Sequence, residues 1–285
     1  MDSCMRSNWY CYDNVYESYS HNIARGFTLD GNRTYHPALK AFILLNEPDL
    51  KVHPRSLTCR VLASAFDAVL QAEKDAGVVG NPIAFTSTFS FALFDGKPPG
   101  LGQMIEFYEC LKNPQMAPTL YTPKNDLMKA YRERWVNGFN TANSAQSVKE
   151  LILDKYGAAF WNDEIKVPVF IGEYHSVHVA AKADVREMLA TASDPRYPFF
   201  MGYNFFEFTR RYDKGGSEEE FGMFAYGECA ISDMNQSGKL YTVWDLAPVR
   251  DRAGDDLAQA VASAYGGAVQ PTFGAGPCFQ SQARR

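Results

Sequence analysis

Short apolar stretches alternate with amphipathic stretches along most of the chain. Five apolar runs with the length of a β-strand lie at residues 40–45, 83–91, 135–140, 167–172 and 199–206. The clearest helical spacing covers residues 56–76, where Ser56 is expected to cap the helix and Gly77 to close it. Further helices are expected at residues 14–27, 101–111, 124–132, 145–156, 182–192 and 254–265. Strands that alternate with helices indicate an α/β fold with a parallel sheet.

Two α/β architectures share this rhythm. In a (β/α)8 barrel the chemistry lies at the carboxyl ends of the strands. A doubly wound sheet that binds nucleotides would carry a glycine-rich phosphate loop, and neither GxGxxG nor GxxxxGK[ST] follows any predicted strand. We therefore predict a TIM-type (β/α)8 barrel as one domain over residues 1–266, followed by a loose Gly/Pro-rich tail over residues 267–285.

Composition narrows the possible partners. The apolar runs are too short for the ~20 residues that a transmembrane helix needs. The net charge of −5, without a basic block, argues against nucleic acid and against an anionic membrane surface. Aromatic residues make up 14% of the chain, which fits either core packing or a cleft whose rings stack on sugars.

The cysteines and the glycosylation sequons bear on cofactors and on the cellular compartment. No CxxC and no Cys/His cluster with metal-ligand spacing occurs, so we expect no metal site, whereas two or three disulfides are possible. The sequons Asn32-Arg-Thr and Asn235-Gln-Ser favour a secretory route. The first residues lack the apolar core of a signal peptide.

Two glutamates stand out because each ends a strongly apolar predicted strand. Glu47 follows AFILLN and Glu173 follows VPVFIG. A carboxylate in a barrel mouth is partly desolvated, which raises its pKa and suits acid/base chemistry. The alternative for either residue alone is a structural carboxylate that satisfies backbone donors. Two such carboxylates across one cleft are what hydrolysis of a glycosidic bond requires.

The sequence around these glutamates resembles clan A of the glycoside hydrolases. FILLNEPDL resembles the Asn-Glu-Pro signature that ends the fourth barrel strand, and VPVFIGEY resembles the nucleophile motif of the seventh. Glu47 and Glu173 end the first and fourth predicted strands, which is the same separation of three strands. The resemblance implies a retaining β-glycosidase with Glu47 as acid/base, Glu173 as nucleophile and Asn46 on the sugar 2-hydroxyl. It implies no metal and no organic cofactor.

The segment from PVFIGEYHS through FFMGYNFFEF to EEEFGMF resembles the end of the β-1,3-glucan-acting families 17 and 72. Family 5 cellulases and mannanases share the two-glutamate scaffold, but their eighth strand usually presents a Trp. Phe206 or Phe208 stands at that place here. The resemblance therefore favours a β-1,3-glucan hydrolase or transglycosylase, with a family 5 type enzyme as the alternative.

Other candidates to bind the sugar lie at or beside a presumed strand end. For the asparagines the alternative is capping of a strand end, and for the histidine it is a surface loop. The candidates are Tyr174, His175, Asn137, Asn140, Tyr203, Phe206, Glu207 and, on a strand presumed at residues 8–12, Trp9.

One feature departs from the clan pattern. Only 46 residues precede Glu47, which leaves room for one βα unit where the clan has about half a barrel. The expectation is a barrel incomplete at its N-terminus, with about strands three to eight, that belongs to a monomeric, secreted or cell-wall protein. An inactive or carbohydrate-binding remnant, and a barrel lyase or isomerase with two glutamate bases, are the alternatives from other classes.

Overall fold

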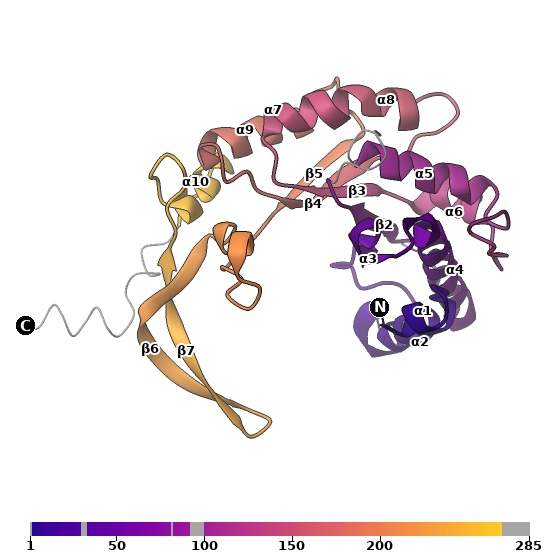
Figure 1. Ribbon diagram of the computed structural model, residues 1–285, viewed down its shortest axis with the longest axis horizontal. Coiled ribbons are helices and arrows are strands. Elements are labelled where there is room, and N and C mark those ends of the chain that lie inside the picture. The colour runs from indigo at the N-terminus through magenta and orange to yellow at the C-terminus, as the bar shows by residue number, and fades with distance from the viewer. Residues whose placement is uncertain (1, 30–32, 81, 92–99, 270–285) are drawn as a thin grey trace, which may run out of the picture. The chain divides into compact units, whose positions relative to one another are not determined.

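The computed structural model describes residues 2–29, 33–80, 82–91 and 100–269 (Figure 1). The strands are β1 Ala41–Asn46, β2 Ala84–Phe89, β3 Asn137–Thr141, β4 Val169–Tyr174, β5 Phe200–Phe205, β6 Phe224–Gln236 and β7 Lys239–Pro248. The helices are α1 Asp2–Arg6, α2 Tyr12–Asn22, α3 Pro48–Lys51, α4 Thr58–Ala76, α5 Leu101–Lys112, α6 Leu127–Arg134, α7 Ala145–Val148, α8 Asp154–Phe160, α9 Ala181–Ala192 and α10 Leu257–Ala264. None of these helices is both long and apolar enough to cross a bilayer.

Strands β1 to β5 form one sheet in chain order. Strand β2 pairs in parallel with both β1 and β3, and Asn46 of β1 lies opposite Thr88 of β2. Parallel neighbours need a crossover, and the long helix α4 supplies it between β1 and β2. The predicted parallel α/β sheet is confirmed.

The apolar run at residues 40–45 forms a strand, but that strand is not buried. The residues of β1 are exposed or half-buried, and Ile43 is 42% exposed. By contrast, β2 is buried from Phe85 to Phe89. The difference arises because, in the described part of the chain, β1 is an edge strand that pairs only with β2.

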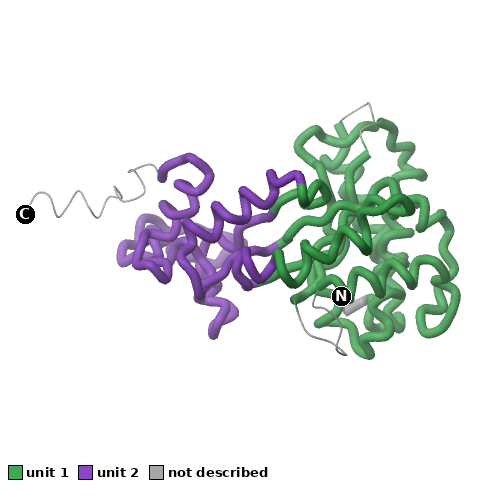
Figure 2. The backbone as a smooth tube through the Cα atoms, turned by 90° about the horizontal axis from the view of Figure 1, so that it is seen from above, with its two compact units in different colours: residues 1–141, 149–172, 196–202 green, residues 142–148, 173–195, 203–285 purple. Residues whose placement is uncertain are grey.

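The chain divides into two compact units (Figure 2). Unit 1 comprises residues 1–141, 149–172 and 196–202. Unit 2 comprises residues 142–148, 173–195 and 203–285. Strand β4 therefore begins in unit 1 and ends in unit 2 with Glu173 and Tyr174.

Helix α4 packs its apolar stripe into the core of unit 1. The ring of Phe66 lies 5.8 Å from that of Phe85 and 5.0 Å from that of Trp135. Gly77 ends the helix in the left-handed conformation with φ 63°, as predicted. The predicted cap at Ser56 is wrong, because a 3-10 turn over Arg55–Leu57 moves the helix start to Thr58.

Unit 2 contains a long antiparallel hairpin, β6–β7, that the sequence pattern did not predict (Figure 1). The hairpin turns at Ser237 and Gly238, with φ 54° and 83°. Two positive φ angles in a two-residue loop are typical of a type I′ turn, and Ser-Gly is a turn dipeptide. Most of the hairpin side chains are exposed, including large apolar ones such as Tyr226, Leu240 and Trp244.

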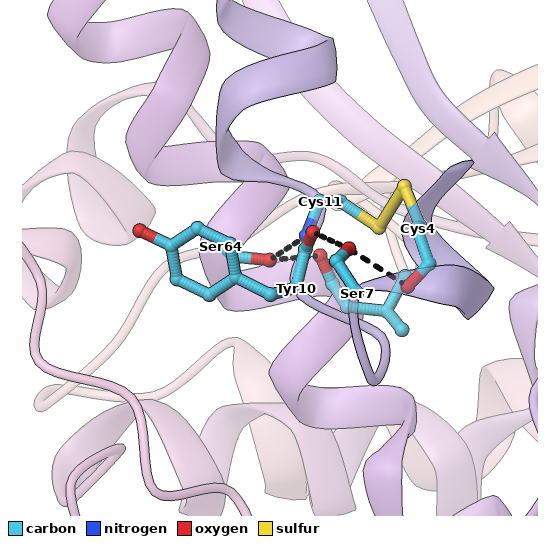
Figure 3. The surroundings of a disulfide bond; sticks show 6 residues. Cys4, Ser7, Tyr10, Cys11 and Ser64 are labelled. Carbon is cyan, nitrogen blue, oxygen red and sulfur yellow. Dashed lines mark hydrogen bonds between the residues drawn. A yellow bond between two sulfur atoms is a disulfide. The ribbon is translucent and has the colours of Figure 1, made fainter.

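The N-terminal segment is a disulfide-closed helical turn, and not the strand presumed at residues 8–12 (Figure 3). The Cα atoms of Cys4 and Cys11 are 4.7 Å apart. The Ser7 hydroxyl donates to the carbonyl oxygen of Tyr10 at 2.7 Å, and Ser64 of α4 accepts from the amide of Cys11 at 3.0 Å. Asn8 and Trp9 have φ 53° and 62°, which an extended strand does not allow.

A second disulfide joins Cys59 of α4 to Cys110 of α5 across 51 residues of sequence. A disulfide stabilises a protein mainly by restricting the unfolded chain, and the effect grows with the length of the loop that it closes. Removing this disulfide by Cys59→Ala/Cys110→Ala should therefore lower the free energy of unfolding by about 4 kcal/mol. Removing Cys4–Cys11, which spans 7 residues, should cost only about 2 kcal/mol. Urea unfolding of the two double variants measures both losses. An equal loss, or a larger one for Cys4–Cys11, would contradict this account.

Candidate active site

Glu47 has a left-handed backbone conformation at the end of β1, with φ 51° and ψ 53°. A non-glycine residue in this region costs on the order of 1 kcal/mol or more, and such residues cluster at functional sites. Pro48 disfavours the right-handed helical conformation for the residue before it. The amide of Glu47 donates to the carbonyl oxygen of Thr88 at 2.7 Å. The Glu-Pro sequence and this bond together direct the chain from β1 into α3.

Side chains from three parallel strands meet beside Glu47. The Asn140 amide donates through Nδ2 to Oδ1 of Asn46 at 2.9 Å and to Oε1 of Glu47 at 3.3 Å. The Thr88 hydroxyl also donates to Oδ1 of Asn46. We call these four residues, Asn46, Glu47, Thr88 and Asn140, the Glu47 cluster. The cluster contains three of the predicted site residues, all within unit 1.

One polar atom of the Glu47 cluster has no partner in the described part of the chain. Oδ1 of Asn140 is buried and accepts no hydrogen bond there. A buried acceptor without a donor costs about 1–3 kcal/mol. A hydrogen-bond donor on a bound ligand would supply the missing partner.

Gly172 of β4 contacts the same cluster. A Cβ atom at this position would lie 2.4 Å from Cγ2 of Thr88 and 2.8 Å from Oδ1 of Asn140. Only glycine fits so close an approach. Neither Thr88 nor Gly172 was predicted as part of the site, although Gly172 immediately precedes Glu173 in the motif.

The variant Gly172→Ala should therefore displace Thr88 and Asn140. We expect it to lower the free energy of unfolding by about 1–3 kcal/mol and, for the glycosidase that the resemblance implies, to reduce kcat more than 10-fold. Thr88→Ser removes Cγ2 but keeps the hydroxyl that binds Asn46, so the double variant Gly172→Ala/Thr88→Ser should recover part of both losses. Thermal unfolding and a kinetic assay of the three variants check this. A Gly172→Ala protein that behaves like the wild type would contradict the close contact.

Unit 2 brings Phe206 and Glu207 near the end of β4. The amide of Phe206 donates to the carbonyl oxygen of Tyr174 at 3.0 Å, and the Phe206–Glu207 peptide bond is cis. Burial raises the pKa of Glu207, as does the negative charge of Glu173, whereas Arg211 lowers it. Glu207 Oε1 is buried without a hydrogen-bond partner among the described residues. The negative charge of Glu173 therefore acts on Glu207 within unit 2.

His175 is buried in unit 2 rather than on a surface loop. Its Nδ1 lies 3.0 Å from the carbonyl oxygen of Phe221, and its ring is 4.7 Å from that of Phe205. Burial lowers the pKa of His175 to about 4. The imidazole is therefore neutral at pH 7.

The predicted sugar-binding roles of Tyr174 and Tyr203 are wrong. Tyr174 is fully buried and donates its hydroxyl to Asp184 of α9. The Tyr203 ring lies 5.0 Å from the Tyr174 ring, and its hydroxyl donates to the carbonyl oxygen of Val185 at 3.4 Å. Neighbouring residues of a strand point to opposite faces of the sheet. Tyr174 consequently faces away from the side that Glu173 faces.

Asn137 and Trp9 are also core residues, which corrects their predicted roles. Asn137 has no exposed surface, and its amide binds Tyr131, Trp135 and Tyr156. It lies three residues before Asn140, toward the other end of β3. Trp9 is 6% exposed and donates from Nε1 to the carbonyl oxygen of His53 at 2.9 Å.

Within the residues that the structure describes, no group of three or more His, Cys, Asp or Glu side chains could hold a metal ion.

Comparison with known proteins found no family model and no curated protein that matches this chain.

Proposed function

We propose that this protein is a retaining β-glycoside hydrolase or transglycosylase that acts on a β-glucan, with β-1,3-glucan as the favoured substrate. Glu47 is the general acid/base and Glu173 is the nucleophile. The five-stranded sheet is part of a TIM-type barrel in this proposal. The observation that carries it is the Glu47 cluster at the carboxyl ends of β1, β2 and β3, where barrel enzymes hold their catalytic groups.

The hydrogen bonds of the cluster suit the two roles that the resemblance assigns to Asn46 and Glu47. Asn46 accepts from both Thr88 and Asn140 through Oδ1, so these bonds fix the orientation of the amide. A fixed amide can recognise the sugar 2-hydroxyl without a further loss of side-chain entropy. The bond from Asn140 to Oε1 likewise orients the Glu47 carboxyl group.

The proposed reaction has two steps. Glu47 donates a proton to the departing glycosidic oxygen while a Glu173 carboxylate oxygen bonds to the anomeric carbon. Glu47, now a carboxylate, then takes a proton from water, or from a sugar hydroxyl in transglycosylation. That oxygen attacks the anomeric carbon and releases Glu173. Phe206 provides an aromatic surface near Glu173 for the sugar ring.

The two disulfides of unit 1 support a secreted or cell-wall location, since structural disulfides persist in oxidising compartments. The exposed Asn235, which accepts from the amide of Gly238, is accessible to glycosylation on such a route. Asn32 of the other sequon lies outside the described residues.

The anomeric form of the first product tests the proposal. We expect proton NMR of a fresh digest of a β-1,3-gluco-oligosaccharide to show the β-anomer before mutarotation, and a smaller rate on cellotetraose. An α-anomer as first product would contradict retention. A folded protein that binds these oligosaccharides but releases no product would instead indicate a carbohydrate-binding remnant.

A further inference from the structure

A polar cavity of about 570 Å³ lies wholly within unit 2. It is built by the segments that follow β4, β5 and β7. Its lining includes His175 and His178 after β4, Arg210 after β5, and Arg250 and Arg252 after β7. Because His175 is two residues beyond Glu173, the cavity begins close in sequence to the proposed nucleophile.

Arginine dominates the charge of this cavity. Nε of Arg210 is buried and has no hydrogen-bond partner among the described residues. Arg250 and Arg252 are both exposed, and Nη1 of Arg250 donates to the carbonyl oxygen of Gly254 at 3.2 Å. A buried guanidinium N–H without an acceptor is costly. A ligand oxygen in the cavity would satisfy it.

Neither carboxylate that lines the cavity accepts a hydrogen bond from Nε of Arg210. Asp251 accepts the backbone amide of Ala181 at 2.9 Å, and its other oxygen accepts the amides of Ala253 and Asp255. Asp251 therefore holds the loop that follows β7. Glu220 is exposed, and no contact joins it to Arg210. Three arginines thus face two carboxylates, beside a neutral His175.

We propose that this cavity binds an oxyanion carried by the saccharide, either the carboxylate of a uronic acid or a sulfate ester. The guanidinium fork matches the spacing of such oxygens, and hydrogen bonds between charged groups are about twice as strong as neutral ones. The inference rests on the proposed function and gives its substrate class: an acidic β-glucan whose charged sugar lies near the cleaved bond.

Calorimetric titration of the Glu173→Gln protein tests this without turnover. The probes are laminaritetraose, the same oligosaccharide with one sulfate ester, its counterpart with a terminal glucuronic acid, and sodium sulfate. We expect one of the two charged oligosaccharides to bind about 10-fold more tightly than laminaritetraose at 0.05 M salt, and less so at 0.5 M. Which of the two binds more tightly identifies the anion.

Introducing Arg210→Gln into the Glu173→Gln protein should remove this 10-fold preference. The affinity for laminaritetraose should stay within 2-fold of that of the Glu173→Gln protein. Arg252→Gln, at an exposed position, should reduce the preference about 3-fold and guards against misfolding of the first variant. Arg186→Gln removes an exposed arginine of α9 outside the cavity, so it should change nothing. Equal binding of charged and neutral oligosaccharides would overturn the inference. So would sodium sulfate that binds as tightly as the charged sugar.

Failure of this inference and failure of the proposed function give different results. If only the inference fails, the wild-type protein cleaves laminaritetraose and neither arginine variant alters the binding of charged sugars. If only the proposed function fails, the wild type cleaves none of the probes while the charge preference that depends on Arg210 persists.

Discussion

Replacing Glu173 by glutamine is expected to lower kcat/KM for dinitrophenyl β-glucoside by on the order of 10⁴-fold or more, which corresponds to about 5.4 kcal/mol of transition-state stabilisation. The amide is isosteric with the carboxylate but cannot attack the anomeric carbon. Release of dinitrophenolate measures the loss. Azide should not restore a product of retained β configuration, because azide that attacks from the face of Glu173 inverts the anomeric carbon and gives the α-glycosyl azide.

The control for this variant is Glu164→Gln, which changes an exposed glutamate by the same atoms. It should retain the activity of the wild type. If Glu173→Gln is as active as Glu164→Gln, Glu173 has no part in the mechanism.

Replacing Glu47 by alanine is expected to affect substrates according to their leaving groups. Dinitrophenolate departs without a proton, so formation of the glycosyl-enzyme survives, whereas cleavage of a β-glucan should fall by on the order of 10³-fold. The second step then stalls, because no base activates water. Azide needs no base, and it should accelerate turnover and yield a β-glycosyl azide. Steady-state rates on the two substrates, with and without azide, measure this pattern.

This pattern distinguishes loss of the acid/base group from damage to the fold. A damaged fold would slow the reactions of both substrates equally, and azide would have no effect. That result would identify Glu47 as a structural or binding carboxylate. Asn140→Leu provides a matched test of positioning, since it removes the bond to Oε1 but leaves the carboxyl group in place. Because Asn140 orients the Glu47 carboxyl group, this variant should slow cleavage of the β-glucan more than release of dinitrophenolate, and azide should restore part of the turnover.

Much of the sheet could be predicted because the relevant signals are local. The segments that became β2 and β4 are rich in β-branched and aromatic residues over the length of a strand, and Gly77 ends α4 through its own backbone freedom. The exposure of β1 could not be predicted, because it depends on which strands pair with it. The hairpin β6–β7 was not predicted, because it depends on the pairing of two mostly exposed strands with each other.

The sequence could predict which residues of the candidate site lie at the end of a strand. It could not predict toward which side each side chain points. Asn46 and Glu47 were found from a strand end followed by proline. Thr88 and Gly172 joined the cluster only through the register of neighbouring strands and a close backbone approach. The orientation of Tyr174 could have been predicted from strand alternation alone, which places its side chain on the other face of the sheet from that of Glu173. Asn137 and Asn140 are both asparagines of β3, and only their positions along the strand place Asn137 in the core and Asn140 in the Glu47 cluster.

Covalent trapping tests the central claim most directly. Incubation with 2,4-dinitrophenyl 2-deoxy-2-fluoro-β-glucoside should give a stable glycosyl-enzyme, because fluorine slows both steps while the good leaving group permits the first. Intact mass should show one added sugar per chain, and peptide mapping should locate it on Glu173. The adduct should be absent from Glu173→Gln. Labelling of another residue, or no labelling of a protein that hydrolyses β-glucan, would contradict the assignment of Glu173 as the nucleophile.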